Sequence, residues 1–188
     1  TYTAEVEIPG GVKDVIIDIT GRMADINRLN NSKKMPVYWT YDKLQYGPVS
    51  FRKYVAKYRV DAWYNAIDGI KVGGKFSGNY FNYKHLIEAR AFYNTGVQFS
   101  GTDEATVDNR DAFSYTVGYK TRVAKHANLG LSSKWMAGWM YHTIGIDRQT
   151  DKGMFVLDFA SADRRNSSYL LYPEFANNGL DNWVNLGF

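Results

Sequence analysis

Residues 54–85, YVAKYRVDAWYNAIDGIKVGGKFSGNYFNYKH, contain the alternation of side chains that decides the fold of this chain. Successive side chains of a β-strand point to opposite faces of a sheet. One row is apolar and consists of Tyr54, Ala56, Tyr58, Val60, Ala62 and Tyr64, and the other is mostly polar and consists of Val55, Lys57, Arg59, Asp61, Trp63 and Asn65. After the hairpin signal Asp68-Gly69, the alternation resumes over residues 70–80. The stretch predicts two antiparallel strands with one dry face and one wet face.

Two later runs, residues 86–97 and 112–121, repeat this pattern. Their apolar rows are Ile87, Ala89, Ala91, Tyr93 and Val97, and then Phe113, Tyr115, Val117 and Tyr119. Each run of this kind is about 10 to 12 residues long, roughly twice the usual strand of a soluble sheet and close to the span of a tilted strand that crosses a bilayer.

Two kinds of sheet satisfy the alternation. A soluble antiparallel sheet turns its polar face to water, and a membrane barrel turns its apolar face to lipid and its polar face inward. The strand length, the tyrosines near the ends of the apolar rows and the absence of cysteine favour the barrel. We therefore expect a lumen-facing row of Lys57, Arg59, Asp61, Lys71, Lys75, Glu88 and Arg90, and a lipid-facing row of Tyr54, Tyr58, Val60, Tyr64, Val72, Phe76 and Tyr80.

The expected fold class is all-β, an antiparallel transmembrane β-barrel preceded by a short N-terminal β-hairpin and a linker. The hairpin would join AEVEIP and KDVIIDI through Gly10-Gly11, and the polar residues 21–35 would form the linker. This divides the chain into residues 1–35, the end of a soluble β-domain plus linker, and residues 36–188, the barrel region. We expect five to seven crossing strands, fewer than the roughly eight of a closed bacterial barrel, so missing sequence would complete it.

The composition narrows the possible functions of the chain. It has 188 residues with 15 Tyr, 10 Phe, 5 Trp and no Cys, and its net charge of +4 comes from interleaved acids and bases. No nucleic-acid-binding arm, disulfide scaffold or transmembrane helix is expected from these features. The chain begins at Thr1 without an initiator Met, which is typical of a processed or partial chain.

Two stretches of the sequence resemble one protein family. VEIPGGVKDVIIDITGRMADINRLNN resembles the end of the peptidase portion of the periplasmic aminopeptidase-N-like metallopeptidases of Bacteroidetes-type bacteria. YRVDAWYNAIDGIKVGGKFSGNYFN and ARAFYNTG resemble the first strands of the outer-membrane β-barrel that follows the peptidase. The resemblance covers residues 5–97. It implies a bacterial outer-membrane location, a lipid bilayer and lipopolysaccharide as partners, further outer-membrane subunits as possible neighbours, and no nucleic acid.

No catalytic residue, cofactor site or metal site is predicted within this chain. The family's zinc motif is His-Glu-x-x-His, which His85, His126 and His142 do not match. His85 and Glu88 would point to opposite faces of a strand and could not share a metal. Any catalytic residues of a parent zinc metallopeptidase would lie upstream of Thr1.

Other candidate sites have simpler interpretations. Asp103, Glu104, Asp108 and Asp111 share one loop and could hold calcium, but a solvated loop explains them more simply. GGKFSG at residues 73–78 lacks the ending of a phosphate-binding loop. Trp135, Trp139 and Trp183 could stack on sugars or sit in a lipid-interface belt.

The sequence thus predicts an anchoring or translocation barrel of a metallopeptidase-like protein. The alternatives are a soluble all-β carbohydrate-binding module and a capsid-type jelly roll.

Overall fold

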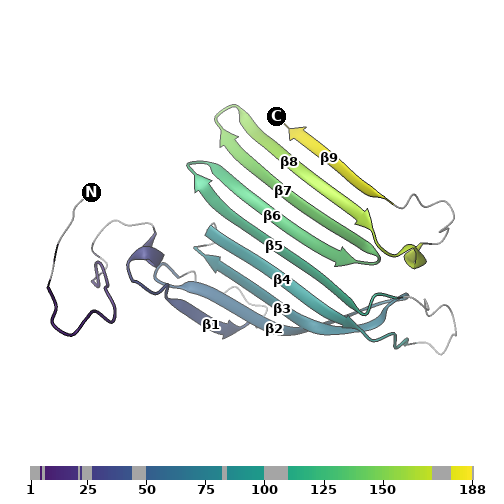
Figure 1. The fold of residues 1–188 in the computed structure, drawn as a ribbon, viewed down its shortest axis with the longest axis horizontal. Coiled ribbons are helices and arrows are strands. Elements are labelled where there is room, and N and C mark those ends of the chain that lie inside the picture. Colours follow the sequence, from purple (N-terminus) through teal and green to yellow (C-terminus); the bar gives the residue numbers. More distant parts are fainter. Residues whose placement is uncertain are drawn as a thin grey trace.

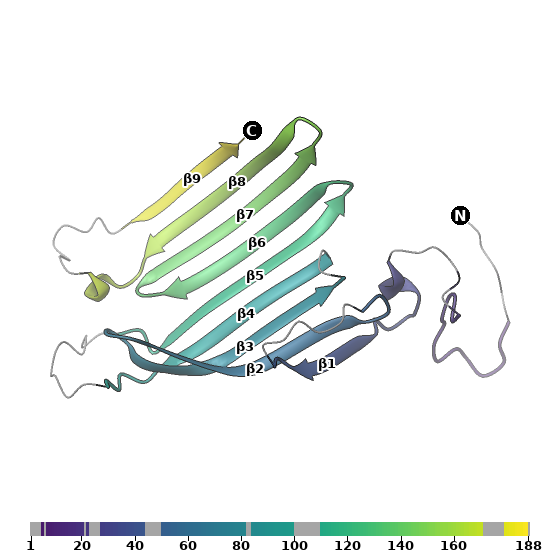
Figure 2. The same cartoon turned by 180° about the vertical axis from the view of Figure 1, so that it is seen from behind.

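The computed structural model describes residues 5, 7–20, 22, 27–43, 50–81, 84–99, 110–170 and 179–187. They form one sheet of nine strands (Figures 1 and 2). The strands are β1 (Val37–Tyr41), β2 (Tyr54–Asn65), β3 (Gly69–Tyr80), β4 (Lys84–Asn94), β5 (Phe113–Ala124), β6 (Ala127–Met136), β7 (Trp139–Thr150), β8 (Gly153–Arg164) and β9 (Leu180–Gly187). Two single 3-10 turns, η1 (Arg28–Asn30) and η2 (Ser167–Tyr169), are the only helical elements in these ranges. None of the described helices could span a membrane.

The strands follow one another through the sheet in chain order, from β1 to β9. Every pair from β2–β3 to β8–β9 is antiparallel, whereas β1 pairs with β2 in parallel. The predicted all-β class and antiparallel sheet are confirmed. The sheet is open, with β1 and β9 at its two edges, so the closure of a barrel is not part of this structure.

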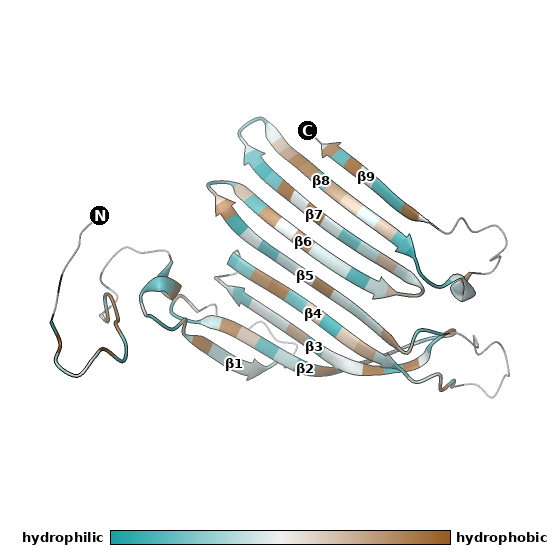
Figure 3. Ribbon diagram, viewed as in Figure 1, coloured by the Kyte–Doolittle hydropathy of each residue, from teal (hydrophilic) through white to brown (hydrophobic). Residues whose placement is uncertain are grey.

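The register places the two predicted rows on opposite faces. On one face Tyr58 lies opposite Phe76, which in turn lies opposite Ala89. On the other face Arg59 lies opposite Lys75, which lies opposite Arg90. The pattern continues to β9, and Figure 3 shows hydropathy alternating along the strands. We call these the apolar face and the polar face.

The connections differ between the two ends of the sheet. Residues 81–83, 125–126 and 151–152 connect strands at one end, which we call the turn end. Residues 66–68, 95–112, 137–138 and 165–179 connect them at the other, which we call the loop end. The prediction of five to seven strands was too low, because the pattern after Asn128 is less regular yet forms β6 to β9 in full.

The predicted N-terminal hairpin is wrong for the described part of its residues. A turn is present, with the Gly11 N–H donating to Ile8 at 3.4 Å, but no strand forms on either side of it. Instead Ile17 donates its N–H to Asn31 at 2.6 Å, and Val15 accepts from Lys33 at 3.3 Å. The segment's valines and isoleucines are exposed, so a hairpin here would have had no apolar surface to pack against.

The linker is held against the turn end of the apolar face by one small core. Leu29 of η1 is buried with Tyr54, Ala56 and Tyr80. The Tyr80 hydroxyl accepts a hydrogen bond from the Arg28 N–H at 3.0 Å. Leu29 thus fixes where the chain enters the sheet.

Two neighbouring glycines of β3 have opposite surroundings. A Cβ on Gly73, which belongs to the polar face, would overlap the backbone carbonyl of Ala91 on β4. A Cβ on Gly74, which belongs to the apolar face, would meet only the Arg59 carbonyl oxygen at 3.6 Å. The absence of a side chain at Gly73 is therefore what lets β3 and β4 approach there.

We predict that Gly73→Ala lowers the free energy of unfolding by about 1–3 kcal/mol, because the backbone of β4 must move to accept the methyl group. Gly74→Ala is the matched control, and its effect should stay below about 1 kcal/mol. Urea unfolding followed by tryptophan fluorescence measures both. Equal stability of the two variants would contradict the close approach at Gly73.

Candidate membrane-facing surface and polar interior

The apolar face is the more exposed face of the sheet. Val60 is 71% exposed, whereas the side chains of its neighbours Arg59 and Asp61 on the polar face are only 18% and 21% exposed. The same alternation recurs along β7, where Ile144 is exposed and Thr143 is half-buried. The exposed large side chains of this face are Tyr58, Val60, Tyr64, Val72, Tyr93, Phe113, Val117, Leu131, Ile144, Ile146, Phe155, Leu157, Phe159, Val184 and Leu186. A soluble sheet buries its apolar face and exposes its polar face, whereas here the apolar face is the more exposed one.

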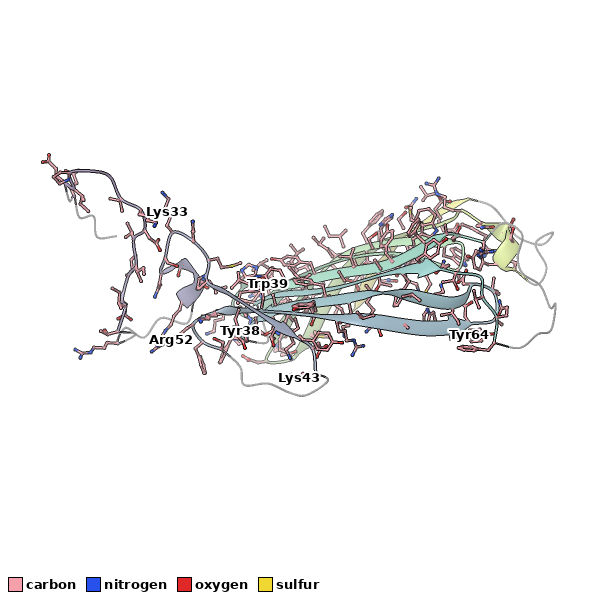
Figure 4. The ribbon with its side chains drawn as sticks, turned by 90° about the horizontal axis from the view of Figure 1, so that it is seen from below. Lys33, Tyr38, Trp39, Lys43, Arg52 and Tyr64 are labelled. Carbon is pink, nitrogen blue, oxygen red and sulfur yellow. The ribbon has the colours of Figure 1, made fainter. Side chains whose placement is uncertain are left out.

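Aromatic residues gather where the apolar face approaches the loop end. Tyr93 and Phe113 pack edge to face with ring centroids 5.4 Å apart, and Tyr115 packs against Trp135 at 6.5 Å. Tyr64 lies at the same end of the sheet (Figure 4). The middle of the face mixes aliphatic and aromatic side chains, with Leu131 and Ile144 of β6 and β7 next to Phe159 of β8. An exposed apolar face with aromatic rings toward one end is a surface that suits a bilayer and its interface.

The polar face pairs its charges within one strand, between neighbouring strands and across an intervening strand. Glu88 of β4 accepts from Lys75 at 3.3 Å and from Arg90 at 2.8 Å. Asp147 of β7 pairs with Lys120 at 2.9 Å and accepts from Asn128 at 2.6 Å. These contacts satisfy partly buried groups in the way a wet interior requires, although each exposed pair adds little stability.

A groove of 570 Å³ runs along this polar face. Charged and hydroxyl side chains line it, and glycines of β5, β6 and β7 deepen it. The lining includes Glu88, Lys120, Ser132, Thr143, Asp147 and Asp158, with Gly118, Gly130 and Gly145 below them. The lining combines these polar groups with apolar surface, to which Leu86, Ile87 and Leu131 contribute.

A fully buried ion pair lies at the loop end. Asp68 and Lys71 have no exposed side-chain surface, and their Oδ2 and Nζ atoms are 2.5 Å apart. Lys71 also donates to the Ser114 hydroxyl at 3.3 Å, and the Trp63 ring lies 5.5 Å from its ammonium. Asn65 donates to the Asp68 carboxylate at 2.9 Å. The pair is therefore fully partnered, as a buried pair must be.

Asp111 is a second centre of hydrogen bonds at this end. Its carboxylate accepts from the Trp135 indole at 3.1 Å, the Gly138 N–H at 3.2 Å and the Asn166 amide at 3.2 Å. Together Asp68 and Asp111 link the four loop-end connections, which lie between the eight strands from β2 to β9. We call this set the loop-end network: Asn65, Asp68, Lys71, Asn94, Asp111, Ser114, Trp135, Asn166 and Tyr169.

Tyr169 of η2 joins the two centres. Its hydroxyl donates to Asp68 Oδ1 at 2.5 Å and accepts the Asp111 N–H at 2.8 Å. Burial, and then the hydrogen bond to Asp68, raise the pKa of Tyr169 above its ordinary value, while the bond from the Asp111 N–H lowers it. The phenol therefore stays a neutral donor at physiological pH. Figures 1 and 2 show the ends of β2 and β3 bending toward η2.

The residues of the two predicted rows lie on opposite faces of the sheet, and four of them differ in exposure from the rest of their row. Phe76 of the expected lipid-facing row is half-buried beside Trp39. Tyr54 and Tyr80 of the expected lipid-facing row are 5% and 1% exposed, because Leu29 covers them. Lys71 of the expected lumen-facing row is buried in the loop-end network. The other polar members, Lys57, Arg59, Asp61, Lys75, Glu88 and Arg90, line the polar face.

No cluster of three or more His, Asp or Glu side chains that could hold a metal ion is present among the described residues. His85 Nδ1 hydrogen-bonds with the Tyr119 hydroxyl at 2.7 Å, while Glu88 pairs with Lys75 and Arg90 on the polar face. Asp111 serves the loop-end network, and the calcium candidates Asp103, Glu104 and Asp108 lie outside the described residues. GGKFSG is the middle of β3.

The three tryptophans that could stack on sugars are separated. Trp135 is on the apolar face opposite Tyr115, whereas Trp183 is opposite Ala160 on the polar face. Trp139 lies under Arg164, whose guanidinium carbon is 4.2 Å from the ring centroid. They do not form one binding platform.

Sequence reasoning missed the loop-end network. From the sequence, Asp111 is expected only as a loop carboxylate, and Asn94, Ser114 and Tyr169 have no predicted role. The one available signal is local, the Asn65-x-x-Asp68 turn, in which Asn65 accepts from the Asp68 N–H at 2.6 Å.

We predict that Tyr169→Phe lowers the free energy of unfolding by about 1–3 kcal/mol, because the Asp68 carboxylate and the Asp111 N–H each lose a partner. Tyr141→Phe is the control, since the Tyr141 ring packs on Trp183 and its hydroxyl has no hydrogen bond to another described residue. Its effect should stay within about 0.5 kcal/mol. Thermal unfolding compares the two, and equal stabilities would show that Tyr169 does not hold the network.

No family model, curated protein or solved structure was found to match this sequence.

Proposed function

We propose that this chain is the membrane-spanning region of a bacterial outer-membrane β-barrel, with anchoring or translocation as its role. The observation that carries the proposal is the exposure of the apolar face beside a half-buried polar face, as at Val60 and Asp61. In water such a face costs about 25 cal/mol for each Å² of apolar surface, whereas lipid removes that cost. The antiparallel ladder satisfies the backbone between its edges, as a spanning sheet requires.

The connectivity fits a barrel of the smallest bacterial size. The strands from β2 to β9 are all antiparallel to their neighbours, which gives an even set with β2 and β9 running in opposite directions. Closed bacterial barrels begin at about eight strands, and their two edge strands pair in this antiparallel sense. β1 occupies the edge of β2 over Tyr54–Tyr58. In the proposed barrel, β9 pairs directly or through further strands with the rest of that edge, residues 59–65.

The ends of the sheet also fit an orientation across the outer membrane. Short turns of such barrels face the periplasm and long loops face outward. From β3 onward the turn-end connections are short, and both the linker and the β1–β2 connection, residues 42–53, lead into strands at this end. The two longest connections, 95–112 and 165–179, are at the loop end. The proposed orientation puts the loop end outside the cell and the linker in the periplasm.

The groove on the polar face suits a hydrophilic lumen. Its ion pairs and hydroxyls would line a plugged or narrow path, and material passing to a tethered domain would meet Glu88, Lys120 and Asp158. The chain's own contribution is physical and not catalytic.

The N-terminal segment fits the proposal that a metallopeptidase-like domain precedes the barrel. Ile8, Val15, Ile17 and Ile19 are all exposed, at 51%, 54%, 55% and 77%. Apolar side chains with no cover of their own suit the edge of a preceding β-domain. The resemblance of residues 6–31 to the end of such a peptidase points the same way.

The test compares two neighbouring residues of β5 on opposite faces. We predict that Val117→Asp, on the apolar face, reduces insertion into liposomes about thirtyfold, or about 2 kcal/mol. Thr116→Asp adds the same charge on the polar face, where Arg90 and Lys134 lie opposite it, and should insert like the unmodified chain. The measurement is the folded fraction recovered with liposomes.

A soluble module predicts the reverse behaviour. The unmodified chain would then be monodisperse in plain buffer, and Val117→Asp would raise its solubility without a loss of folding. That result would overturn the membrane proposal.

A further inference from the structure

Four cations surround the turn end of the sheet without ion-pair partners. Lys84 begins β4, Lys125 is in the β5–β6 turn, Arg148 is near the end of β7, and Lys152 is in the β7–β8 turn. We call them the basic rim. None of the four is in an ion pair with another described residue. The carboxylate nearest to them in sequence, apart from the paired Asp147, is Asp151.

Two of these cations mark the border of the apolar face. Arg148 is opposite Ala127 and Phe155, one step beyond Ile146 on that face. Lys84 lies opposite Tyr80 in the same way. A long cationic side chain at such a border lays its methylene stem on apolar surface and extends its charge to the depth of lipid headgroups.

The turn end carries more positive charge than these four residues alone. Lys33 of the linker and Arg52, which precedes β2, are exposed and lie toward this end, away from Tyr64 (Figure 4). Both add positive charge at the turn end.

Charged groups at the loop end are held in ion pairs. Asp163 lies at the border of the apolar face, opposite Met140 and Leu180, and is paired with Arg165 at 2.6 Å. The buried Lys71 is paired with Asp68. These pairs contrast with the basic rim, whose cations have no ion pair with a described residue.

We propose that the basic rim binds the phosphate headgroups of anionic phospholipids at the membrane surface on the turn-end side. This inference rests on the proposed membrane-spanning function. The turn-end side is the periplasmic side in that orientation, whose leaflet consists of phospholipid, so the partner is an anionic glycerophospholipid and not lipopolysaccharide. Each cation near an anionic membrane surface strengthens binding about fivefold.

The experiment measures how much vesicle lipid is needed to insert half of the full chain. Vesicles of phosphatidylcholine are compared with vesicles that also contain phosphatidylglycerol, and with vesicles that contain lipopolysaccharide. We expect phosphatidylglycerol to favour insertion, and Lys125→Gln/Lys152→Gln to reduce that preference about 30-fold. Lys57→Gln/Lys134→Gln removes the same charge from the polar face and should keep the preference.

The outcomes separate this inference from the function on which it rests. Insertion into phosphatidylcholine with no preference for phosphatidylglycerol overturns the inference alone. It is also overturned if both double variants lose the preference for phosphatidylglycerol equally. The same holds if insertion of the Lys125→Gln/Lys152→Gln variant depends more strongly on lipopolysaccharide than insertion of the unmodified chain does. Failure to insert into any of the vesicles overturns the membrane-spanning function as well.

Discussion

The structure depends on one constraint, the exposure of an apolar sheet face. Hydrogen bonding within the ladder satisfies the backbone between the two edge strands, so the sheet itself needs no further polar partners. What it lacks among the described residues is a second layer over Tyr58, Val60 and their neighbours. The positions of the charges, the aromatic rings and the linker all follow from this exposed apolar face. Charges are collected on the polar face, aromatic rings near the loop end, and the linker residue Leu29 covers only the corner where the chain enters.

The connections at the two ends of the sheet are stabilised in different ways. At the turn end the connections are short and need only local backbone geometry, including a left-handed residue at His126. At the loop end the longer connections would leave polar groups unpaired, and the loop-end network gives them partners. A buried ion pair such as Asp68–Lys71 contributes little net stability, but breaking one half of it is costly. The network therefore specifies how the loops are arranged more than how stable they are.

Much of the sheet could be predicted because residues close together in the sequence determine it. A period of two along residues 54–80 fixes which side chains share a face, and Asp68-Gly69 fixes the first hairpin. The N-terminal segment has equally good strand residues, Val15 to Ile17, yet forms no hairpin, because strand formation requires a surface to pack on and periodicity does not supply one. The loop-end network could not be predicted, since Tyr169 and Asp68 are brought together only by the completed order of the strands.

The Tyr169–Asp68 hydrogen bond also has a kinetic consequence. Every strand pairs with its neighbours in sequence, so the sheet can grow one hairpin at a time with small losses of loop entropy. This bond instead joins residues 101 positions apart and can form only after β8 has been added. It is a late event in such a pathway, and its contribution would appear in the rate at which the finished sheet comes apart and hardly in the rate at which it assembles.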